Sequence, residues 1–372
     1  MKILMLLSKH FITDPRVQKE AETLHTEKND ITVIVWDRKN KLKSEEIVDG
    51  ISVNRIHNTF LMNILPNIIR VLIWWRKAYK KGLELYKGGF NFEVVHCHDL
   101  DTLQIGVWLK KKTGCKLIYD AHELFGYMIE NSAPKFVVKY AFKMENKLIK
   151  NIDHLITVDS PFKKYFSSIT KKPITVVMNC KNLIYNNYEP KKNDIFTLIY
   201  IGGMSNRRFF PDIVDLVGNI PRVRFMIAGL EGWLFEEVKE RCKQYDNMDF
   251  LGTIPSDDIL PLTRKADISY MVVDPSSKQN ELTAYNKQFE AMVCGTPIIC
   301  TKGTYAGEMT EELNCGLTVD YTEKSIKQAI IKLRDNPDLR EKLGRNAFDA
   351  AKKRYNWGIE KKKLLKVYEE MT

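Results

Sequence analysis

Short apolar runs alternate with amphipathic helical segments along the whole chain of 372 residues. Residues 3–7, 31–36, 116–120 and 196–201 are examples of such runs. This alternation is typical of parallel α/β layers, in which each helix returns the chain so that successive strands point the same way. Because one hydrophobic core stops growing at roughly 250 to 300 residues, the length predicts two such domains.

The composition excludes several classes of protein. With 44% hydrophobic and 28% charged residues, the chain is typical of a globular protein. Its seven cysteines are odd in number and contain no C-x-x-C pair, which predicts free thiols in the reducing cytoplasm. The run at residues 71–75 is far shorter than the about 20 apolar residues of a membrane-spanning helix. The run at residues 3–7 is too short for a signal peptide, so we expect a cytoplasmic protein.

Positive charge is concentrated in the first half. Of the formal net charge of +11, residues 1–180 carry +10, from 29 Lys and Arg against 19 Asp and Glu. Two helices are predicted there, after Pro66 and Pro134. The first has cations beside a predicted packed stripe formed by Ile68, Leu72, Trp75, Tyr79, Leu83 and Tyr86.

Two interpretations of these basic helices remain open. One is a solvated face over a packed core stripe. The other is docking, peripherally, on the anionic inner face of the membrane, where each cation contributes about 1 kcal/mol. Nucleic-acid binding would use only the charge, and because the sequence has no zinc, RNP-like or helix-turn-helix pattern, we expect no nucleic-acid partner.

The most informative segment is NKQFEAMVCGTPIICT, residues 286–301. It predicts a helix capped by Asn286 and ended by Gly295, followed by a buried strand. Lys287 would lie in the first turn, where free N–H groups and the helix dipole favour an anion such as a diphosphate. Glu290, one turn later, is at a suitable reach for a ribose diol. The alternative is that Lys287 and Glu290 are an exposed helical pair.

This segment resembles the donor-site signature of glycosyltransferase family 4, N-K-x-x-E-A/Y-x-x-x-G-x-P-V-I. The matching residues are Asn286, Lys287, Glu290, Gly295, Pro297 and Ile298. The resemblance implies the GT-B fold, with two Rossmann-like domains whose parallel sheets face an interdomain cleft. It also implies that the second domain binds a nucleotide sugar. One position departs from the commoner family form, which has a further Glu where this chain has Leu282, with Glu281 one place out of register.

A second donor-side motif, IGGMSNRRFFPD, begins at Ile201. Gly202 and Gly203 allow a close backbone approach, and the planar guanidinium groups of Arg207 and Arg208 suit a diphosphate. The motif is similar to the family's phosphate loop, and the alternative is a solvated loop. By the same resemblance, Thr253 and Ile254 would lie beside the nucleobase.

The first half contains the acceptor-side candidates. The run DPRVQKEAETL, residues 14–24, resembles the opening of many family members, and Arg16 at its helix start is expected to meet an acceptor's phosphate or sugar, unless it is simply solvated. The run Y-D-x-H-E ends at His122 and Glu123. The resemblance implies that His122 approaches the transferred sugar, where it would donate a hydrogen bond or share developing charge. Alternatively, His122 satisfies backbone groups in a turn.

Asp99 and Asp101 form a D-x-D, which holds a metal ion in a different glycosyltransferase fold. Here either residue more simply caps the helix that follows, so we expect no metal.

The sequence therefore predicts a hexosyltransferase of the GT-B type. Residues 1–180, joined by a returning helix at 357–372, would bind a sugar or lipid-linked acceptor, and residues 181–356 would bind a nucleoside diphosphate sugar. His122, Arg207 and Lys287 are the catalytic candidates, with no cofactor, no metal, and retention of anomeric configuration as the family precedent. A GT-B nucleotide-sugar 2-epimerase and a non-catalytic sugar-nucleotide-binding subunit, which would be consistent with Leu282, remain alternatives.

Overall fold

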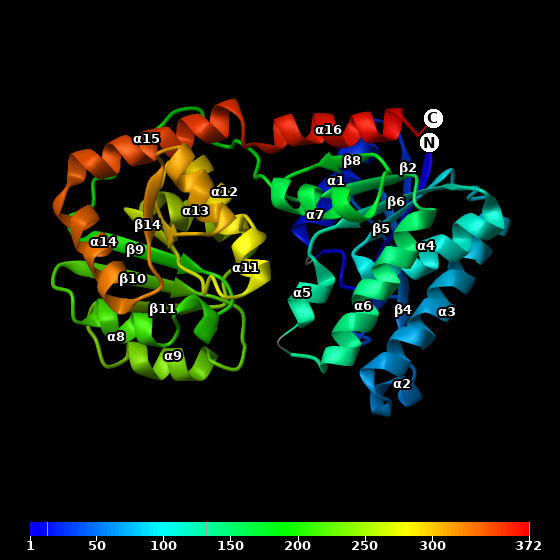
Figure 1. Cartoon of the computed structure of the whole chain (residues 1–372), viewed down its shortest axis with the longest axis horizontal. Coiled ribbons are helices and arrows are strands. Elements are labelled where there is room, and N and C mark those ends of the chain that lie inside the picture. Colours follow the sequence, from blue (N-terminus) through cyan, green and yellow to red (C-terminus); the bar gives the residue numbers. More distant parts are fainter. Residues whose placement is uncertain (13, 131, 372) are drawn as a thin grey trace. The chain divides into compact units, whose positions relative to one another are not determined.

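The chain divides into two compact units in this computed structural model, which describes residues 1–12, 14–130 and 132–371. The first unit comprises Met1–Met178 with Lys361–Thr372, and the second comprises Asn179–Glu360 (Figure 1). The division falls just before the predicted position after residue 180, and the returning segment begins at Lys361 rather than at residue 357.

The first unit is built on an eight-stranded sheet among the described residues, in the order β3-β4-β2-β1-β5-β6-β7-β8. Its pairs are parallel except the edge pair of β3 with β4. The strands are β1 (Lys2–Leu7), β2 (Asp30–Asp37), β3 (Glu45–Val48), β4 (Ile51–His57), β5 (Val94–His98), β6 (Lys116–Ala121), β7 (His154–Thr157) and β8 (Ile174–Val176). The chain reverses its direction of travel across this sheet between β1 and β5, which is the usual ligand-binding point of an open parallel sheet.

The helices that follow these strands belong to the same unit. They are α1 (Pro15–Thr26), α2 (Phe60–Ile64), α3 (Asn67–Lys87), α4 (Leu100–Thr113), α5 (Phe125–Ile129), α6 (Lys135–Leu148) and α7 (Ser160–Ile169). Because crossovers between parallel strands are right-handed, the reversal at β1 places α1 and α3 on opposite faces of the sheet.

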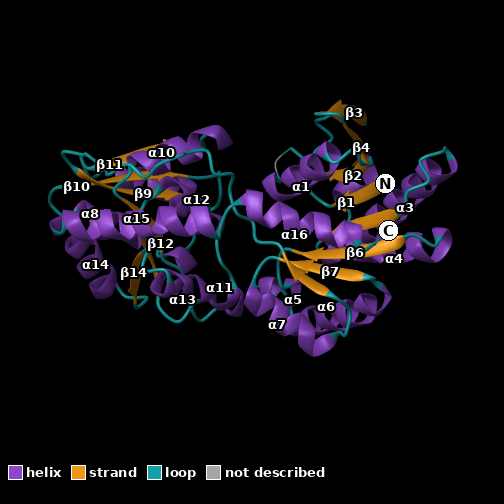
Figure 2. Cartoon of the chain, turned by 90° about the horizontal axis from the view of Figure 1, so that it is seen from above, coloured by secondary structure: helices purple, strands orange, loops and turns teal. Residues whose placement is uncertain are grey.

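The second unit has a six-stranded, wholly parallel sheet among the described residues, in the order β11-β10-β9-β12-β13-β14 (Figure 2). Its strands are β9 (Phe196–Ile201), β10 (Val223–Ala228), β11 (Met248–Gly252), β12 (Ile268–Met271), β13 (Ile298–Thr301) and β14 (Gly316–Val319). Its reversal lies between β9 and β12. The helices are α8 (Asp212–Gly218), α9 (Phe235–Cys242), α10 (Ile259–Lys265), α11 (Lys278–Leu282), α12 (Asn286–Cys294), α13 (Tyr305–Glu312), α14 (Glu323–Asp335) and α15 (Pro337–Lys353), and α16 (Trp357–Glu369) ends in the first unit.

The packed face of α3 differs from the predicted stripe. Ile68 and Leu72 are 64% and 46% exposed, so their predicted burial is wrong. Burial begins two residues after Leu72, at Trp74, which stacks on Trp36 of β2 with ring centroids 5.5 Å apart. The reason is that α3 is longer than its contact with the sheet, so its first turns have no core beneath them.

Two expectations from composition can be compared with the structure. All seven cysteines are unpaired and buried. Among the described residues, no helix combines the length and the apolar character needed to cross a bilayer.

Candidate functional site

Three glycines lie at the carboxyl ends of neighbouring strands in the second unit. The Gly202 N–H, just after β9, donates to the Ala228 carbonyl at 2.9 Å, and the Gly229 N–H, just after β10, donates to the Gly252 carbonyl at 2.9 Å. A Cβ on Gly229 would lie 2.2 Å from the Gly202 carbonyl oxygen. The strand ends therefore approach one another as closely as only glycine allows.

Lys287 lies against this glycine edge. Its Nζ is 5.0 Å from the centroid of the Tyr200 ring, and a Cβ on Gly202 would be 2.6 Å from the same Nζ. Gly202 also has a backbone φ of +150°, a conformation that residues with a side chain rarely adopt. Both the backbone conformation and the space taken by the Lys287 amine thus explain the glycine at this position.

Arg208 approaches the same tyrosine from the loop after β9. Its Nη1 donates to the Gly203 carbonyl at 2.8 Å and to the Tyr200 hydroxyl at 3.3 Å. Burial, and after it the positive charge of Arg208, lower the pKa of Lys287 to about 7, and the Glu290 carboxylate offsets only part of this lowering. Two cations held together in this way form a site that gains stability when an anion binds.

Arg207 faces a different neighbour. Its side chain is exposed, with Nη1 3.5 Å from the Ser277 hydroxyl, and its carbonyl accepts from the Asp274 N–H at 2.7 Å. The structure therefore brings Arg208, rather than Arg207, to the hydroxyl of the tyrosine whose ring Lys287 covers. Tyr200 itself was missed by the sequence analysis, because an aromatic residue near a strand end is most often a core residue.

The start of α12 differs in one detail from the prediction. Tyr285 is the N-cap and Asn286 is the first helical residue, so the predicted capping role of Asn286 is wrong. Its Oδ1 instead accepts a hydrogen bond from the Asn179 side chain at 2.8 Å. Gly295 ends the helix in the left-handed conformation, as predicted.

The remaining donor-side residues differ in exposure and in the partners that they have. The Glu290 carboxylate is buried and pairs with the Lys181 amine at 3.0 Å, a partner that the sequence did not indicate. Thr253 is exposed, and its hydroxyl donates to the Gly229 carbonyl at 3.0 Å, while Ile254 is half-buried. Glu281 pairs with Lys278 at 2.6 Å.

In the first unit, His122 lies between two carboxylates. Its Nε2 is 3.1 Å from Asp120 Oδ2, its Nδ1 is 3.5 Å from Asp99 Oδ2, and its backbone N–H donates to Asp99 Oδ1 at 3.1 Å. Burial alone would lower the pKa of His122, but Asp99 and Asp120 outweigh burial and raise it to about 9. The imidazole is therefore a cation at neutral pH. Neighbouring Glu123 is half-buried.

Arg16 is an internal counter-ion, which corrects the expected contact with an acceptor. Only 3% of the residue is exposed. Its Nε and Nη2 donate to the Asp120 carboxylate at 2.9 to 3.2 Å, and its Nη1 donates to the Val177 carbonyl at 2.7 Å. Although burial opposes it, Arg16 together with His122 holds the pKa of Asp120 well below its usual range. Burial and these bonds leave the guanidinium almost no accessible surface for contact with an acceptor.

Four buried residues of the first unit offer possible metal ligands, namely Glu20, His96, His98 and Asp120, whose ligand atoms lie within 4.8 Å of one another. The Arg16 guanidinium, however, is 3.0 Å from Glu20 and 2.9 Å from Asp120. A metal ion would have to share both carboxylates with this fixed cation, so the cluster suits an ion-pair network better than a metal.

Asp99 and Asp101 also serve separate partners. Asp99 holds His122, whereas Asp101 accepts a hydrogen bond from the Ser8 hydroxyl. Asp99 is the N-cap residue of α4, as predicted, but its side chain makes no capping hydrogen bond.

We expect Asp99→Asn to lower the pKa of His122 by more than one unit, because the carboxylate that contributes most to raising it is removed. An NMR titration of the histidine ring resonances measures this shift. Asp153→Asn serves as the control, since Asp153 pairs with Lys110 instead. An unchanged pKa in Asp99→Asn would show that the charge of His122 has another origin.

Comparison with known proteins agrees with this architecture. The model of Glycosyltransferase Family 4 matches residues 16–183, and that of glycosyl transferases group 1 matches residues 187–350. An uncharacterized glycosyltransferase of Methanocaldococcus jannaschii is 24% identical over 355 residues, covering 92% of this chain and 95% of that protein.

Two solved structures show the same fold. Sucrose-phosphate synthase from Thermosynechococcus elongatus has a TM-score of 0.82 at 15% identity and covers 100% of this chain and 99% of its own. HepE from Anabaena, in complex with UDP-glucose, has a TM-score of 0.72 at 14% identity and covers 99% of each chain. The two matched regions together span most of the sequence, and the chain belongs to glycosyltransferase family 4 with the GT-B fold.

Proposed function

We propose that this glycosyltransferase takes its sugar from a nucleoside diphosphate sugar whose diphosphate is bound by Arg208, Lys287 and the start of α12. The observation that carries this proposal is the convergence of both cations on Tyr200 beside Gly202, with Lys287 over the ring and Arg208 at the hydroxyl. The edge of the sheet where they meet is the reversal between β9 and β12, where open parallel sheets bind ligands. HepE, a structural neighbour, was solved with UDP-glucose, which supports a donor of this class.

The proposed chemistry is electrostatic. Breaking the bond at the anomeric carbon places negative charge on the leaving diphosphate, and fixed cations stabilise that charge in the transition state. Arg208 and Lys287 provide this stabilisation directly, and Arg207 lies nearby on the exposed side of the loop. Because the chain's own cations perform this task, the proposal requires no metal ion and no cofactor.

The acceptor would attack from the side that the diphosphate leaves, so that anomeric configuration is retained, which follows the family precedent. An anomeric assignment of the product by NMR would test this. His122 contributes charge rather than a free hydrogen bond, because both of its ring nitrogens already face carboxylates.

We expect Lys287→Ala to lower kcat by about 10² to 10³, the effect of losing one transition-state donor of this kind. The assay measures acceptor-dependent release of the nucleoside diphosphate. Lys278→Ala is the matched control, because Lys278 is paired with Glu281 on α11. Near-normal turnover in Lys287→Ala would refute the assignment, and epimerised donor in the absence of acceptor would indicate a 2-epimerase instead.

Donor binding is also expected to take up a proton above pH 7. The pKa of Lys287 is about 7 in the free protein, and a bound diphosphate favours the ammonium form and so raises that pKa. Affinity should therefore be highest below pH 7 and fall by up to about tenfold per pH unit above it. Calorimetry at pH 8 in buffers of different ionisation enthalpy measures the proton uptake. Equal uptake in Lys287→Met would assign it to another group.

We further propose that the first unit docks on an anionic membrane, where a lipid-linked acceptor would be found. On α2 and α3, Phe60, Ile64, Ile68 and Leu72 follow one another at intervals of four residues and are all exposed. Phe136 and Tyr140 of α6 are also exposed, at 75% and 61%. Apolar side chains left in water among cations are typical of a helix that lies in a membrane interface.

For this surface we expect Ile68→Ser with Leu72→Ser to reduce binding to acidic vesicles by about tenfold or more, through lost apolar burial. Co-sedimentation measures the bound fraction, and stability should not change because both side chains are exposed. Leu230→Ser, at another exposed leucine, is the control. Binding that is independent of acidic lipid and of salt would contradict the docking.

A further inference from the structure

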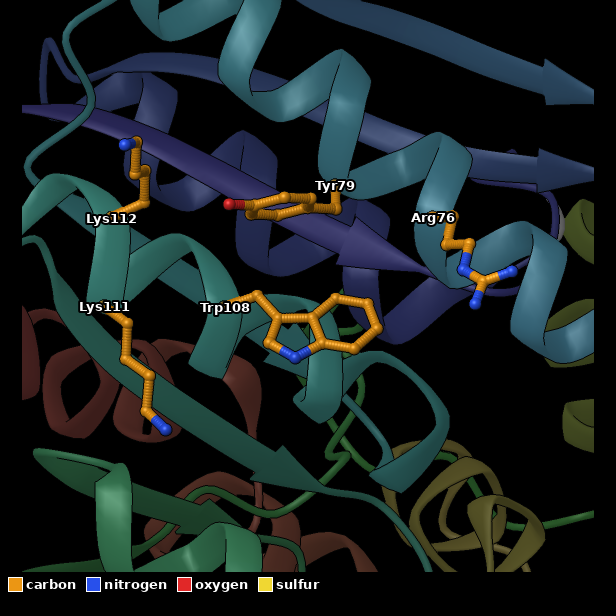
Figure 3. Close-up of a pocket in the computed structure, with 5 residues that line it drawn as sticks. All are labelled: Arg76, Tyr79, Trp108, Lys111 and Lys112. Atoms are coloured by element: carbon orange, nitrogen blue, oxygen red, sulfur yellow. The ribbon is translucent and has the colours of Figure 1, made fainter.

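A separate pocket lies between α3 and α4 of the first unit. Its volume is about 430 Å³, within the range of small-molecule sites. Its lining consists of Arg76 and Tyr79 from α3 and Trp108, Lys111 and Lys112 from α4 (Figure 3). None of these residues belongs to the donor site.

The charge of this pocket is uncompensated. Among the residues that the structure describes, Arg76, Lys111 and Lys112 have no hydrogen-bond or ion-pair partner, and no acidic side chain lines the pocket. Neighbouring cations do have partners, as in the pair of Lys110 with Asp153 at 2.6 Å. The dipole of α4 explains lysines in its last turn. It does not explain Arg76, which lies in the middle of α3.

The pocket also has a fixed aromatic wall. The Trp108 ring meets Tyr79 edge-on at 5.7 Å and Trp75 edge-on at 6.2 Å, and the Trp75 indole donates to the Asp101 carbonyl. Figure 3 shows the two lysines directed to different sides of α4 and Arg76 on the far side of the Trp108 ring. An apolar wall with cations around it suits a molecule that joins a phosphate group to a less polar part.

The position of Arg76 on α3 indicates what kind of molecule carries this phosphate. Ile68, Leu72 and Arg76 follow at intervals of four residues, so Arg76 lies about 6 Å along the helix from Leu72 and about 12 Å from Ile68. Interfacial helices sink their apolar face about 5 to 10 Å into the boundary between headgroups and acyl chains. With Ile68 and Leu72 facing the membrane, Arg76, which follows them along the same side of the helix, would face the lipid phosphates.

We propose that the pocket lined by Arg76, Tyr79, Trp108, Lys111 and Lys112 binds the phosphate of an anionic glycerophospholipid headgroup. This inference rests on the membrane docking proposed above and gives it a specific contact. The guanidinium provides the paired donors for the phosphate, the lysines provide flanking charge, and the Trp108 ring packs against the glycerol backbone of the lipid.

The first test uses Arg76→Lys, which keeps the charge but loses the planar pair of donors. We expect about tenfold weaker binding to dihexanoyl phosphatidylglycerol. Tryptophan fluorescence measures this binding at lipid concentrations below the critical micelle concentration. Arg345→Lys, at an exposed arginine of α15, should bind like the parent protein. Equal binding by Arg76→Lys and the parent would overturn the proposal, since a diffuse basic surface responds only to charge.

The second test compares ligands. Glycerol 3-phosphate should bind more weakly than the short-chain lipid, and tighter binding of glycerol 3-phosphate would assign the pocket to a soluble phosphate ester and overturn the lipid assignment. Short-chain lipid that binds the parent but not Arg76→Lys would support the pocket even if vesicles do not bind, an outcome that would overturn only the membrane docking. Affinity for the nucleotide sugar should stay unchanged in Arg76→Lys, because Arg76 lies outside the donor site.

Discussion

The donor site depends on two basic side chains, those of Lys287 and Arg208, held close together against one tyrosine. Lys287 and Arg208 both contact Tyr200, and burial together with the charge of Arg208 brings the pKa of Lys287 down to about 7. The fold sustains this arrangement because three parallel strands end in glycines at the same edge, which leaves room for a lysine amine above the backbone. A diphosphate would reduce the repulsion between the two cations, and this reduction would contribute to the free energy of binding.

In the first unit, by contrast, the buried charged groups are paired with one another. Arg16, Asp120 and His122 are linked so that each charge has a partner, and the Asp120 carboxylate accepts from both of the others. Such a network leaves little free to contact a ligand, yet it fixes the orientation and the positive charge of His122. Tyr368 of α16 adds a hydrogen bond to His96 at 2.7 Å, which ties the end of the chain to the same core.

The surface of the first unit shows the same distinction between paired and unpaired groups. Lys81 and Lys110 have acidic partners, whereas Arg76, Lys111 and Lys112 have none among the described residues and surround an aromatic wall. The exposed apolar side chains Ile68 and Leu72 of α3 precede Arg76, one of these unpaired cations, along the same helix. Charge and apolar surface that remain without partners in the folded chain are the features that both proposals for this unit use.

The sequence by itself determined the parallel α/β class, the helix of residues 286–294, its end at Gly295 and the family. These follow from local patterns, because hydrophobic periodicity and turn residues act within a few positions of each other. The short strands β3 and β14 were missed, since β3 is a half-exposed edge and β14 begins at a glycine that resembles a turn. Only tertiary structure decided that Arg16 is buried on Asp120, that Arg208 joins Lys287 on Tyr200, and that the first turns of α3 have no core beneath them. Each of these outcomes depends on which side chains from distant parts of the chain lie opposite one another, and no local pattern contains that information.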